Sequence, residues 1–332
     1  MSFVEHDWKR KMISMSKSEA NPLVSVIVPA YNAGEFLQAS IESVLAQTHR
    51  NLEVLVVDDG STDGAVDAAK EQLKDDRIVW HRQENSGKSV ALNFALERIR
   101  GEFYLLQDAD DISSPDRVER LVSAALESPE VAAVFSGYDL ILRGRRVAPI
   151  LRDKSIAQCE RDIDAFAMPS LDPTGMYRVS AIREMRYNES LRIGQGFDYI
   201  LRVGERYPMR MLGECLYSYR VEWGSATRFN PEKRHKMVCE VLRLACERRG
   251  LSFDELFAQS SFLQSKPTPD NGIANHFMAS VQDLRDRNEV LSALRASIQC
   301  LLLNPFVPRF AKPIVCACSP NWFRRRLKSF NG

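Results

Sequence analysis

In the segment Phe103-Tyr104-Leu105-Leu106-Gln107-Asp108-Ala109-Asp110-Asp111, a short apolar strand is followed directly by a cluster of acids, and this pattern is the strongest indication of the fold. Unpaired carboxylates repel one another and gain nothing from an apolar core, so we expect a cation at the end of this strand. In an extended segment Asp108 and Asp110 point to the same face, and two converging carboxylates suit Mg²⁺ or Mn²⁺. A nucleotide diphosphate would complete such a metal site.

Apolar runs of the same kind recur along the first part of the chain and alternate with helical patterns. Each run is short, rich in β-branched residues and bounded by turn residues, which is typical of strands buried on both faces of a mostly parallel sheet. The expected strands are residues 24–28, 52–57, 78–81, 103–106 and 131–135. Helices are expected at 35–47, 63–73 and 118–126, with Asp63 and Ser114 as caps and Pro115 as a first helical residue.

The alternation weakens after Ser136. An extended hairpin is expected at 138–147, helices at 177–185 and 198–207, and a strand at 209–219. From Pro231 onward the pattern is helical, with helices expected at 231–249, 253–263, 273–284 and 289–303. The predicted fold is therefore α/β, with a Rossmann-like, mostly parallel sheet flanked by helices and a C-terminal helical extension.

Composition excludes several classes of protein. The 45 Lys and Arg residues nearly balance the 44 Asp and Glu residues, so there is no basic field for nucleic acid. The seven cysteines are scattered without paired zinc-site spacing, which indicates reduced thiols. Neither a signal-peptide core nor a membrane-spanning apolar run is present in the sequence, so we expect a cytoplasmic protein.

Polar residues follow three of the expected strands. They are Pro29-Ala30-Tyr31-Asn32, the segment from Asp58 to Asp63, and the acids after Leu106. Ligands bind beyond the carboxyl ends of the strands in an open parallel sheet, so these three segments are expected to line one crevice. A turn with a helix cap is the alternative for residues 58–63, although a cap needs one acid rather than three.

These residues resemble the family 2 glycosyltransferases with the GT-A fold. The resemblance is carried by Val24-Ser25-Val26-Ile27-Val28-Pro29-Ala30-Tyr31-Asn32, Val56-Val57-Asp58-Asp59-Gly60-Ser61-Thr62-Asp63, Glu84-Asn85-Ser86-Gly87-Lys88-Ser89-Val90-Ala91-Leu92-Asn93 and Asp108-Ala109-Asp110-Asp111. It is specific over residues 23–127 and weaker up to residue 227. It also includes the segment 172–178, which is similar to the acceptor-side glycine segment of the family.

The resemblance implies a donor site and a metal site. Pro29, Ala30 and Tyr31 would cradle the nucleotide base, with Asp58 accepting a hydrogen bond from its ring N–H; Asp59, Lys88 and Asp108 would complete the donor site. Asp110 would hold Mn²⁺ or Mg²⁺ against the diphosphate. Lys88 lies where it could reach a phosphate, with a solvated lysine at a helix start as the alternative.

The resemblance also implies an inverting transfer, in which a carboxylate removes the proton of the acceptor hydroxyl. The family usually has Glu-Asp at the head of a helix that soon contains an arginine; with Arg202 aligned, the base position falls on Gly196. We predict Asp198 as the base, with a helix cap as the alternative role and Glu189 as the next candidate. Glu222 stands where relatives often have histidine, which suggests either a metal-side role or a different loop closure.

The predicted organisation has three parts. Residues 1–21 form a leader; residues 22–230 form the GT-A domain, with a nucleotide-sugar-binding half at 22–135 and an acceptor half at 136–230; and residues 231–332 form a helical subdomain. Basic and aromatic residues alternate in the tail at 305–330. This suits peripheral contact with the anionic inner face of the cell membrane, with packing on the domain as the alternative.

The predicted function is metal-dependent inverting glycosyl transfer from a nucleotide-diphosphate sugar, expected to be UDP-linked, to a hydroxyl of a glycan or lipid-linked acceptor. Cell-surface polysaccharide synthesis is the expected setting. The alternative is a non-catalytic nucleotide-sugar-binding or scaffold protein of the same fold. A P-loop at residues 86–89 is excluded because Arg82 stands where its first glycine belongs, and no G-x-G-x-x-G follows the first strand as a dinucleotide oxidoreductase would require.

Overall fold

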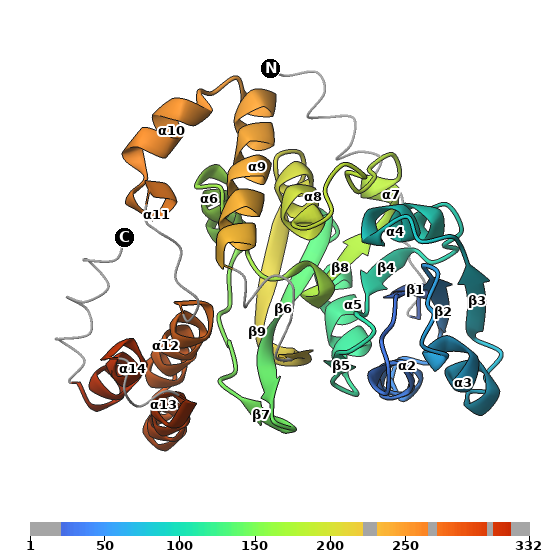
Figure 1. Cartoon of the computed structure of the whole chain (residues 1–332), viewed down its shortest axis with the longest axis horizontal. Coiled ribbons are helices and arrows are strands. Elements are labelled where there is room, and N and C mark those ends of the chain that lie inside the picture. The colour runs from blue at the N-terminus through green and yellow to red at the C-terminus, as the bar shows by residue number, and fades with distance from the viewer. Residues whose placement is uncertain (1–20, 222–230, 265–270, 304–307, 320–332) are drawn as a thin grey trace.

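The computed structural model describes residues 21–221, 231–264, 271–303 and 308–319. A central sheet runs through the molecule with helices on both of its faces, and the C-terminal helices gather beside the far end of the sheet (Figure 1). All of the expected leader at 1–21 except its last residue lies outside the described residues, and so do Glu222 and most of the basic tail.

The first half of the sheet is parallel, as predicted. Its strands lie in the order β3-β2-β1-β4. Their bounds are β1 Val24–Ala30, β2 Leu52–Asp58, β3 Ile78–Arg82 and β4 Phe103–Leu106, and the helices between them are α2 Phe36–Leu45, α3 Ala65–Gln72 and α4 Lys88–Leu96. The edge strand β3 differs from expectation, because it is only partly buried rather than covered on both faces.

Alternating side chains of the parallel strands feed two separate cores. Val26 and Val28 pack with α2 and α3 on one face, whereas Ile27 packs with α4 on the other. Both kinds of position are fully buried, which explains why the sequence of β1 reads as a nearly continuous apolar run, interrupted by Ser25. Burial on two faces fixes the strand ends, and so it fixes the loops that follow them.

The second half of the sheet is mixed. It continues from β4 through β8 Gly175–Arg178, β6 Ala133–Leu142, β9 Met209–Arg220 and β5 Ile112–Ser113, with β7 Arg145–Val147 paired to β6 as the expected hairpin. The helix predicted at 177–185 was wrong for its first residues. Residues 175–178 fill a slot between β4 and β6 and pair with both, so tertiary pairing overrides the local helical pattern. The short helix α7 Val179–Ile182 follows.

The helices around this half also differ in detail from the sequence predictions. They are α5 Arg117–Glu127, α6 Ile156–Asp164, the 3-10 helix η1 Asp172–Thr174 and α8 Gln195–Gly204. Ser114 is not the cap of α5, because Asp116 occupies the cap position and the Ser114 carbonyl accepts the Arg117 N–H at 3.1 Å. Asp63 does accept a backbone N–H at the start of α3, from Ala65 at 3.1 Å.

The C-terminal part is helical, as predicted. It contains α9 Pro231–Arg249, α10 Phe253–Gln259, α11 Ser261–Gln264, α12 Asn271–Asp286, α13 Val290–Leu303 and α14 Pro308–Cys318. The helix expected at 253–263 breaks at Ser260 into α10 and α11. Helices α12 to α14 share an apolar cluster with the β6–β7 hairpin. Among the described helices, none has the length and apolar character that crossing a membrane would require.

Candidate active site

The loops that follow β1 and β2 are tied to each other at the carboxyl edge of the sheet. Ala30 and Asp58 are register partners at the ends of these parallel strands. The backbone N–H of Asn32 donates to Ser61 Oγ at 3.1 Å, and Asn32 Oδ1 accepts the Thr62 N–H at 2.8 Å. Asn32 adopts a left-handed backbone with φ of 48°, which asparagine tolerates. These bonds hold the first two predicted segments in one crevice wall.

Asp58 offers a buried acceptor in this wall. Its side chain is 1% exposed, and Oδ1 accepts the Ser61 N–H at 2.8 Å. Its Oδ2 accepts no hydrogen bond from any described residue, although Arg82 Nε lies 3.5 Å away. An unsatisfied buried acceptor is costly, and a ring N–H of a nucleotide base would satisfy it. Tyr31 is exposed and Pro29 is half-buried at the neighbouring strand end, where a base could lie against them.

Asp59 holds a loop. Its Oδ1 accepts hydrogen bonds from Gln83 Nε2 at 2.7 Å and from the Ser86 N–H at 2.9 Å, while Oδ2 accepts the Gly87 N–H at 2.8 Å. Gly87 has a φ of +97°, and a Cβ there would lie 2.5 Å from the Arg192 guanidinium, so glycine is required. Asp59 therefore positions the start of α4. Both of its carboxylate oxygens already accept hydrogen bonds from described residues of the chain.

The start of α4 brings Lys88 to the acids. Lys88 Nζ lies 2.5 Å from Asp108 Oδ1. The lysine at the start of α4 is therefore ion-paired with the first acid after β4. Burial lowers the pKa of Lys88, but the charge of Asp108 and its hydrogen bond raise the pKa more, so that the net shift is upward. The ammonium is therefore cationic at every physiological pH. A positive charge suited to a phosphate stands at the carboxyl edge of the sheet.

Asp110 and Asp111, the other acids after β4, lie close enough to Asp108 for the carboxylates to repel one another. Burial and the charge of Asp108 raise the pKa of Asp110, and burial with both neighbouring carboxylates raises the pKa of Asp111 well above its ordinary value. The backbone N–H of Arg220 donates to Asp111 Oδ1 at 2.7 Å, and Arg220 Nε donates to the Asp110 carbonyl at 2.8 Å. The Asp110 carboxylate is a fitting ligand for a divalent cation, which would relieve this repulsion.

The side chains of the described residues do not form a complete metal cage by themselves. Within the part of the chain that the structure describes, no three or more His, Cys, Asp or Glu residues are grouped to hold a metal ion. Water and a bound diphosphate are the usual sources of the remaining ligands for a Mg²⁺ or Mn²⁺ ion bound at a carboxylate such as Asp110. Metals of this kind are commonly bound through one or two carboxylates together with substrate phosphates.

A cavity of about 920 Å³ opens beside the Lys88–Asp108 pair. Its lining comes from these two residues, from η1, from the first turn of α8 and from α9 and α12. Asp172 and Gly196 both face it, and Met237 and His276 contribute from α9 and α12. Polar groups at the strand ends therefore continue into a partly apolar space large enough for a sugar or a small glycan.

Asp198, the residue predicted as base, is buried between two arginines. Its side chain is 1% exposed and is ion-paired with Arg202 Nε at 2.8 Å and with Arg248 Nη1 of α9 at 3.0 Å. Asp198 is not among the described residues that line the cavity, and Gly194 rather than Asp198 caps α8. The alternative Glu189 accepts a hydrogen bond from Asn93 Nδ2 at 2.8 Å. The geometry therefore points away from Asp198 as a proton acceptor.

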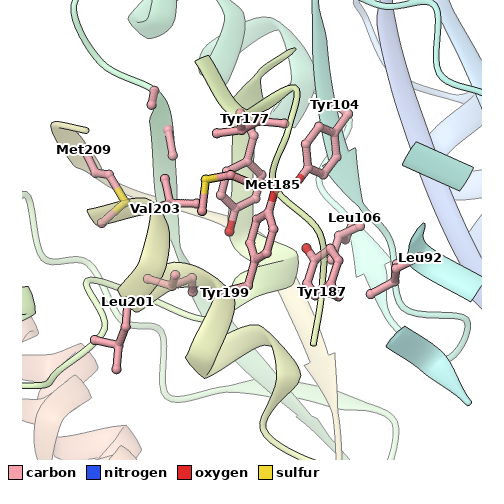
Figure 2. Packing of buried hydrophobic residues seen from close by; sticks show 14 of the residues in the cluster. Leu92, Tyr104, Leu106, Tyr177, Met185, Tyr187, Tyr199, Leu201, Val203 and Met209 are labelled. Atoms are coloured by element: carbon pink, nitrogen blue, oxygen red, sulfur yellow. Dashed lines mark hydrogen bonds between the residues drawn. The ribbon is translucent and has the colours of Figure 1, made fainter. Parts of the chain in front are cut away.

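Asp172 is a cavity residue whose role sequence reasoning missed. It is 8% exposed, and its carboxylate accepts hydrogen bonds from Tyr177 Oη at 2.6 Å and Tyr187 Oη at 3.1 Å. Burial raises the pKa of Asp172 to about 6, against the lowering effect of these bonds and of Lys88. Figure 2 shows Tyr177 and Tyr187 gathered with Tyr104 and Tyr199 in the core. The only sequence signal was its place in the acceptor-side segment.

Arg117 is a second residue that the sequence did not single out. It is fully buried, and its guanidinium donates hydrogen bonds to the Leu106 carbonyl at 3.1 Å and to the Pro173 carbonyl. It therefore ties the end of β4 to η1, which carries Asp172. Burial lowers the pKa of Arg117 to about 10, so it remains cationic in the core at neutral pH. An arginine in the first turn of a surface-like helix gives no sign of this burial in the sequence.

The chain is similar to known proteins in both sequence and structure. Residues 25–175 match the model of the family described as glycosyl transferase family 2. A relative from Bacillus subtilis (strain 168), TuaG, is named as a glycosyltransferase of teichuronic acid biosynthesis and is 43% identical over 122 residues, which are 36% of this chain and 48% of TuaG. The chain thus spans about half of the length of this relative.

Two solved structures share the fold. TarS 1-349 of S. aureus in complex with UDP-GlcNAc has a TM-score of 0.56 at 19% identity, covering 88% of this chain and 89% of that one. The mannosyltransferase PcManGT of Pyrobaculum calidifontis, in complex with GDP-Man and Mn²⁺, has a TM-score of 0.56 at 18% identity, covering 95% and 92%. These matches confirm the GT-A-like α/β fold with its C-terminal helices.

Proposed function

Since the chain belongs to glycosyl transferase family 2, we propose that it moves a sugar from a nucleotide-diphosphate sugar to a hydroxyl group of an acceptor. The observation that carries the proposal is the grouping of Lys88, Asp108 and Asp110 at the carboxyl edge of the sheet, where the cavity of about 920 Å³ begins. A diphosphate would bind at this grouping, and the sugar and acceptor would occupy the cavity.

The charges at the site suit the departure of a diphosphate. As the bond to the sugar breaks, the leaving phosphate gains negative charge, and the fixed ammonium of Lys88 stabilises that charge. A divalent metal held by Asp110 would supply Lewis-acid stabilisation of the same oxygens. The buried Oδ2 of Asp58 would accept a ring N–H of the base, which orients the donor along the strand ends.

We infer that the donor is UDP-linked and that the metal is Mn²⁺ or Mg²⁺. A structural neighbour was solved with UDP-GlcNAc, and another with GDP-Man and Mn²⁺, so GDP is the second nucleotide to test. The name of TuaG places a relative in the synthesis of a bacterial cell-surface polymer, which supports a glycan or lipid-linked acceptor. A lipid-linked acceptor would bring the basic tail at 305–330 to an anionic membrane surface.

The proposal is tested by calorimetric titration of UDP, GDP and dTDP into the protein, with Mn²⁺ and with chelator. We expect one nucleotide, UDP, to bind in a metal-dependent way. Asp110→Asn should weaken that binding by a factor of ten or more, whereas Asp76→Asn should not, because Asp76 is exposed in the loop before β3 at the opposite edge of the sheet. Equal binding by the wild type and Asp110→Asn would refute the metal assignment.

Catalysis is tested separately from binding. Release of UDP from a bound UDP-sugar in the presence of Mn²⁺ would show that the site turns the donor over. The ion pairs of Asp198 favour a second candidate, a non-catalytic nucleotide-sugar-binding protein, because they occupy the carboxylate predicted as base. Tight binding without release of UDP would support that candidate.

A further inference from the structure

The cavity contains a carboxylate with no assigned role, that of Asp172. It begins the 3-10 helix η1 and lines the same cavity as Lys88 and Asp108. Lys88 and Asp108 lie close enough to change the pKa of Asp172, because Lys88 lowers that pKa and Asp108 raises it. Asp172 therefore lines the cavity close to the proposed diphosphate site.

Gly196 makes room for this carboxylate. A Cβ built on Gly196 would lie 2.7 Å from Asp172 Cβ and 2.8 Å from Asp172 Oδ2. No real side chain tolerates such a contact, so the Asp172 carboxylate fills the volume that a residue at position 196 would otherwise occupy. The first turn of α8 has no carboxylate of its own in the cavity among the described lining residues, and η1 supplies one from the opposite side.

The carboxylate is oriented by tyrosines that are themselves fixed. Tyr177 Oη donates to Asp172 Oδ1, and Tyr187 Oη donates to Oδ2. Tyr187 stacks on Tyr199 with ring centroids 4.1 Å apart, and Tyr104 Oη donates to Tyr199 Oη at 2.8 Å (Figure 2). Tyr187 Oη also lies within hydrogen-bond distance of Oδ1, at 3.4 Å. A carboxylate oxygen can accept two hydrogen bonds, so Oδ2 is the oxygen that keeps capacity for a further donor.

We propose that Asp172 is the general base of this protein, an assignment that rests on the proposed glycosyl transfer. The acceptor O–H gives its proton to a carboxylate oxygen of Asp172 while the acceptor oxygen bonds to the anomeric carbon of the sugar. The bond from that carbon to the diphosphate oxygen breaks, and its electron pair leaves with the nucleoside diphosphate. Asp172 then releases the proton to solvent, and no further reactant is needed.

The environment of Asp172 suits this task. A general base works best when its pKa is near the working pH, and burial raises the pKa of Asp172 to about 6. The carboxyl group is therefore largely ionised at neutral pH and is a stronger base than an ordinary aspartate. Activity should rise with pH through about 6, because only the ionised form accepts a proton.

Asp172→Asn separates this inference from the proposed function. The readouts are calorimetric binding of UDP with Mn²⁺ and the release of UDP from the UDP-sugar that binds most tightly, with water as the acceptor. We expect Asp172→Asn to bind UDP as the wild type does and to release it at least about a hundredfold more slowly. Asp76→Asn is the matched control and should behave as the wild type in both assays.

The outcomes are distinguishable. Release of UDP by Asp172→Asn within a few-fold of the wild type overturns Asp172 as base while the proposed function stands. If Asp172→Asn loses both UDP binding and turnover, Asp172 has a structural role in the site, and its role as base is overturned. Absence of nucleotide binding by the wild type overturns the proposed function itself.

Tyr187→Phe provides a readout that a merely structural role would not move. Removing its hydroxyl takes away a hydrogen bond that stabilises the ionised Asp172 carboxylate, so the pKa of Asp172 should rise. The acid limb of the pH profile for UDP release should shift to higher pH, with activity recovered on its plateau. An unshifted limb with a uniformly lower rate would contradict the assignment of that limb to Asp172.

Discussion

Asp172→Asn should stabilise the folded protein at and above neutral pH, although it removes the residue that we propose as base. Burial raises the pKa of the Asp172 carboxyl from 3.8 to about 6, so the native state must hold a carboxylate that would ionise more easily in the unfolded chain. Asparagine carries no charge, and its amide oxygen can still accept the hydrogen bond of Tyr177. The substitution therefore removes the cost of ionisation and keeps the main contact.

The magnitude follows from linkage. The native state binds the Asp172 proton more tightly than the unfolded state, so the penalty grows as pH rises from about 4 and is complete above the native pKa of about 6. A shift of this size corresponds to about 3 kcal/mol at pH 8, at about 1.4 kcal/mol for each pKa unit. At pH 5 about half of that penalty is present. The stability gap between Asp172→Asn and the wild type should thus widen by about 1.5 kcal/mol from pH 5 to pH 8.

The assay is urea denaturation of wild type, Asp172→Asn and Asp76→Asn at pH 5, 6, 7 and 8. The free energy of unfolding is compared between variants at each pH, which cancels the titration of all other groups. Asp76 is exposed, so its variant should show no widening gap. An Asp172→Asn variant that is less stable than the wild type at pH 8, or a gap that does not change with pH, would refute the reasoning.

Three further substitutions address the other acids and the loop before α4. Asp58→Ala should weaken UDP binding about tenfold both with Mn²⁺ and with chelator, because a base contact does not depend on the metal; calorimetry that shows a loss only with Mn²⁺ would contradict this. Asp198→Asn should lower the free energy of unfolding by about 2–3 kcal/mol in urea, since Arg202 and the partly exposed Arg248 lose their common carboxylate, and UDP binding should persist. Gly87→Ala should cost about 1–2 kcal/mol because its backbone is left-handed and a Cβ would meet a guanidinium; an unchanged urea midpoint would show that the loop adapts.

The parallel half of the fold was predictable because its information is local. Strands β1, β2 and β4 are nearly continuous apolar runs, and burial on both faces is what such runs indicate. β8 was not predictable in the same way. Residues 175–178 become a strand only because β4 and β6 leave a slot between them, and no local pattern in the sequence records that slot.

In the candidate site, too, the features set by local sequence were predictable and those set by tertiary contacts were not. The acids after β4 and the polar ends of β1 and β2 follow directly from strand positions, so the sequence could group them. The ion pair of Asp198 could not be predicted, because its partner Arg248 belongs to α9, far along the chain, and only the tertiary structure brings them to 3.0 Å. The sequence places Gly196 where the family usually has a carboxylate, but only the structure brings the Asp172 carboxylate into the volume that a side chain at position 196 would occupy.

The donor site and the proposed base are electrostatically linked. Lys88 lowers the pKa of Asp172 and Asp108 raises it, and these are the groups that a metal-bound diphosphate would contact. A phosphate bound at Lys88 would offset the positive charge that lowers the pKa of Asp172. A divalent cation near Asp108 would offset the negative charge that raises the pKa of Asp172. A metal-free diphosphate would therefore leave Asp172 more readily protonated than a metal-bound one. A divalent metal bound here would serve both halves of the proposed reaction, because it would stabilise the departing phosphate and would keep the proposed base ionised for the incoming hydroxyl.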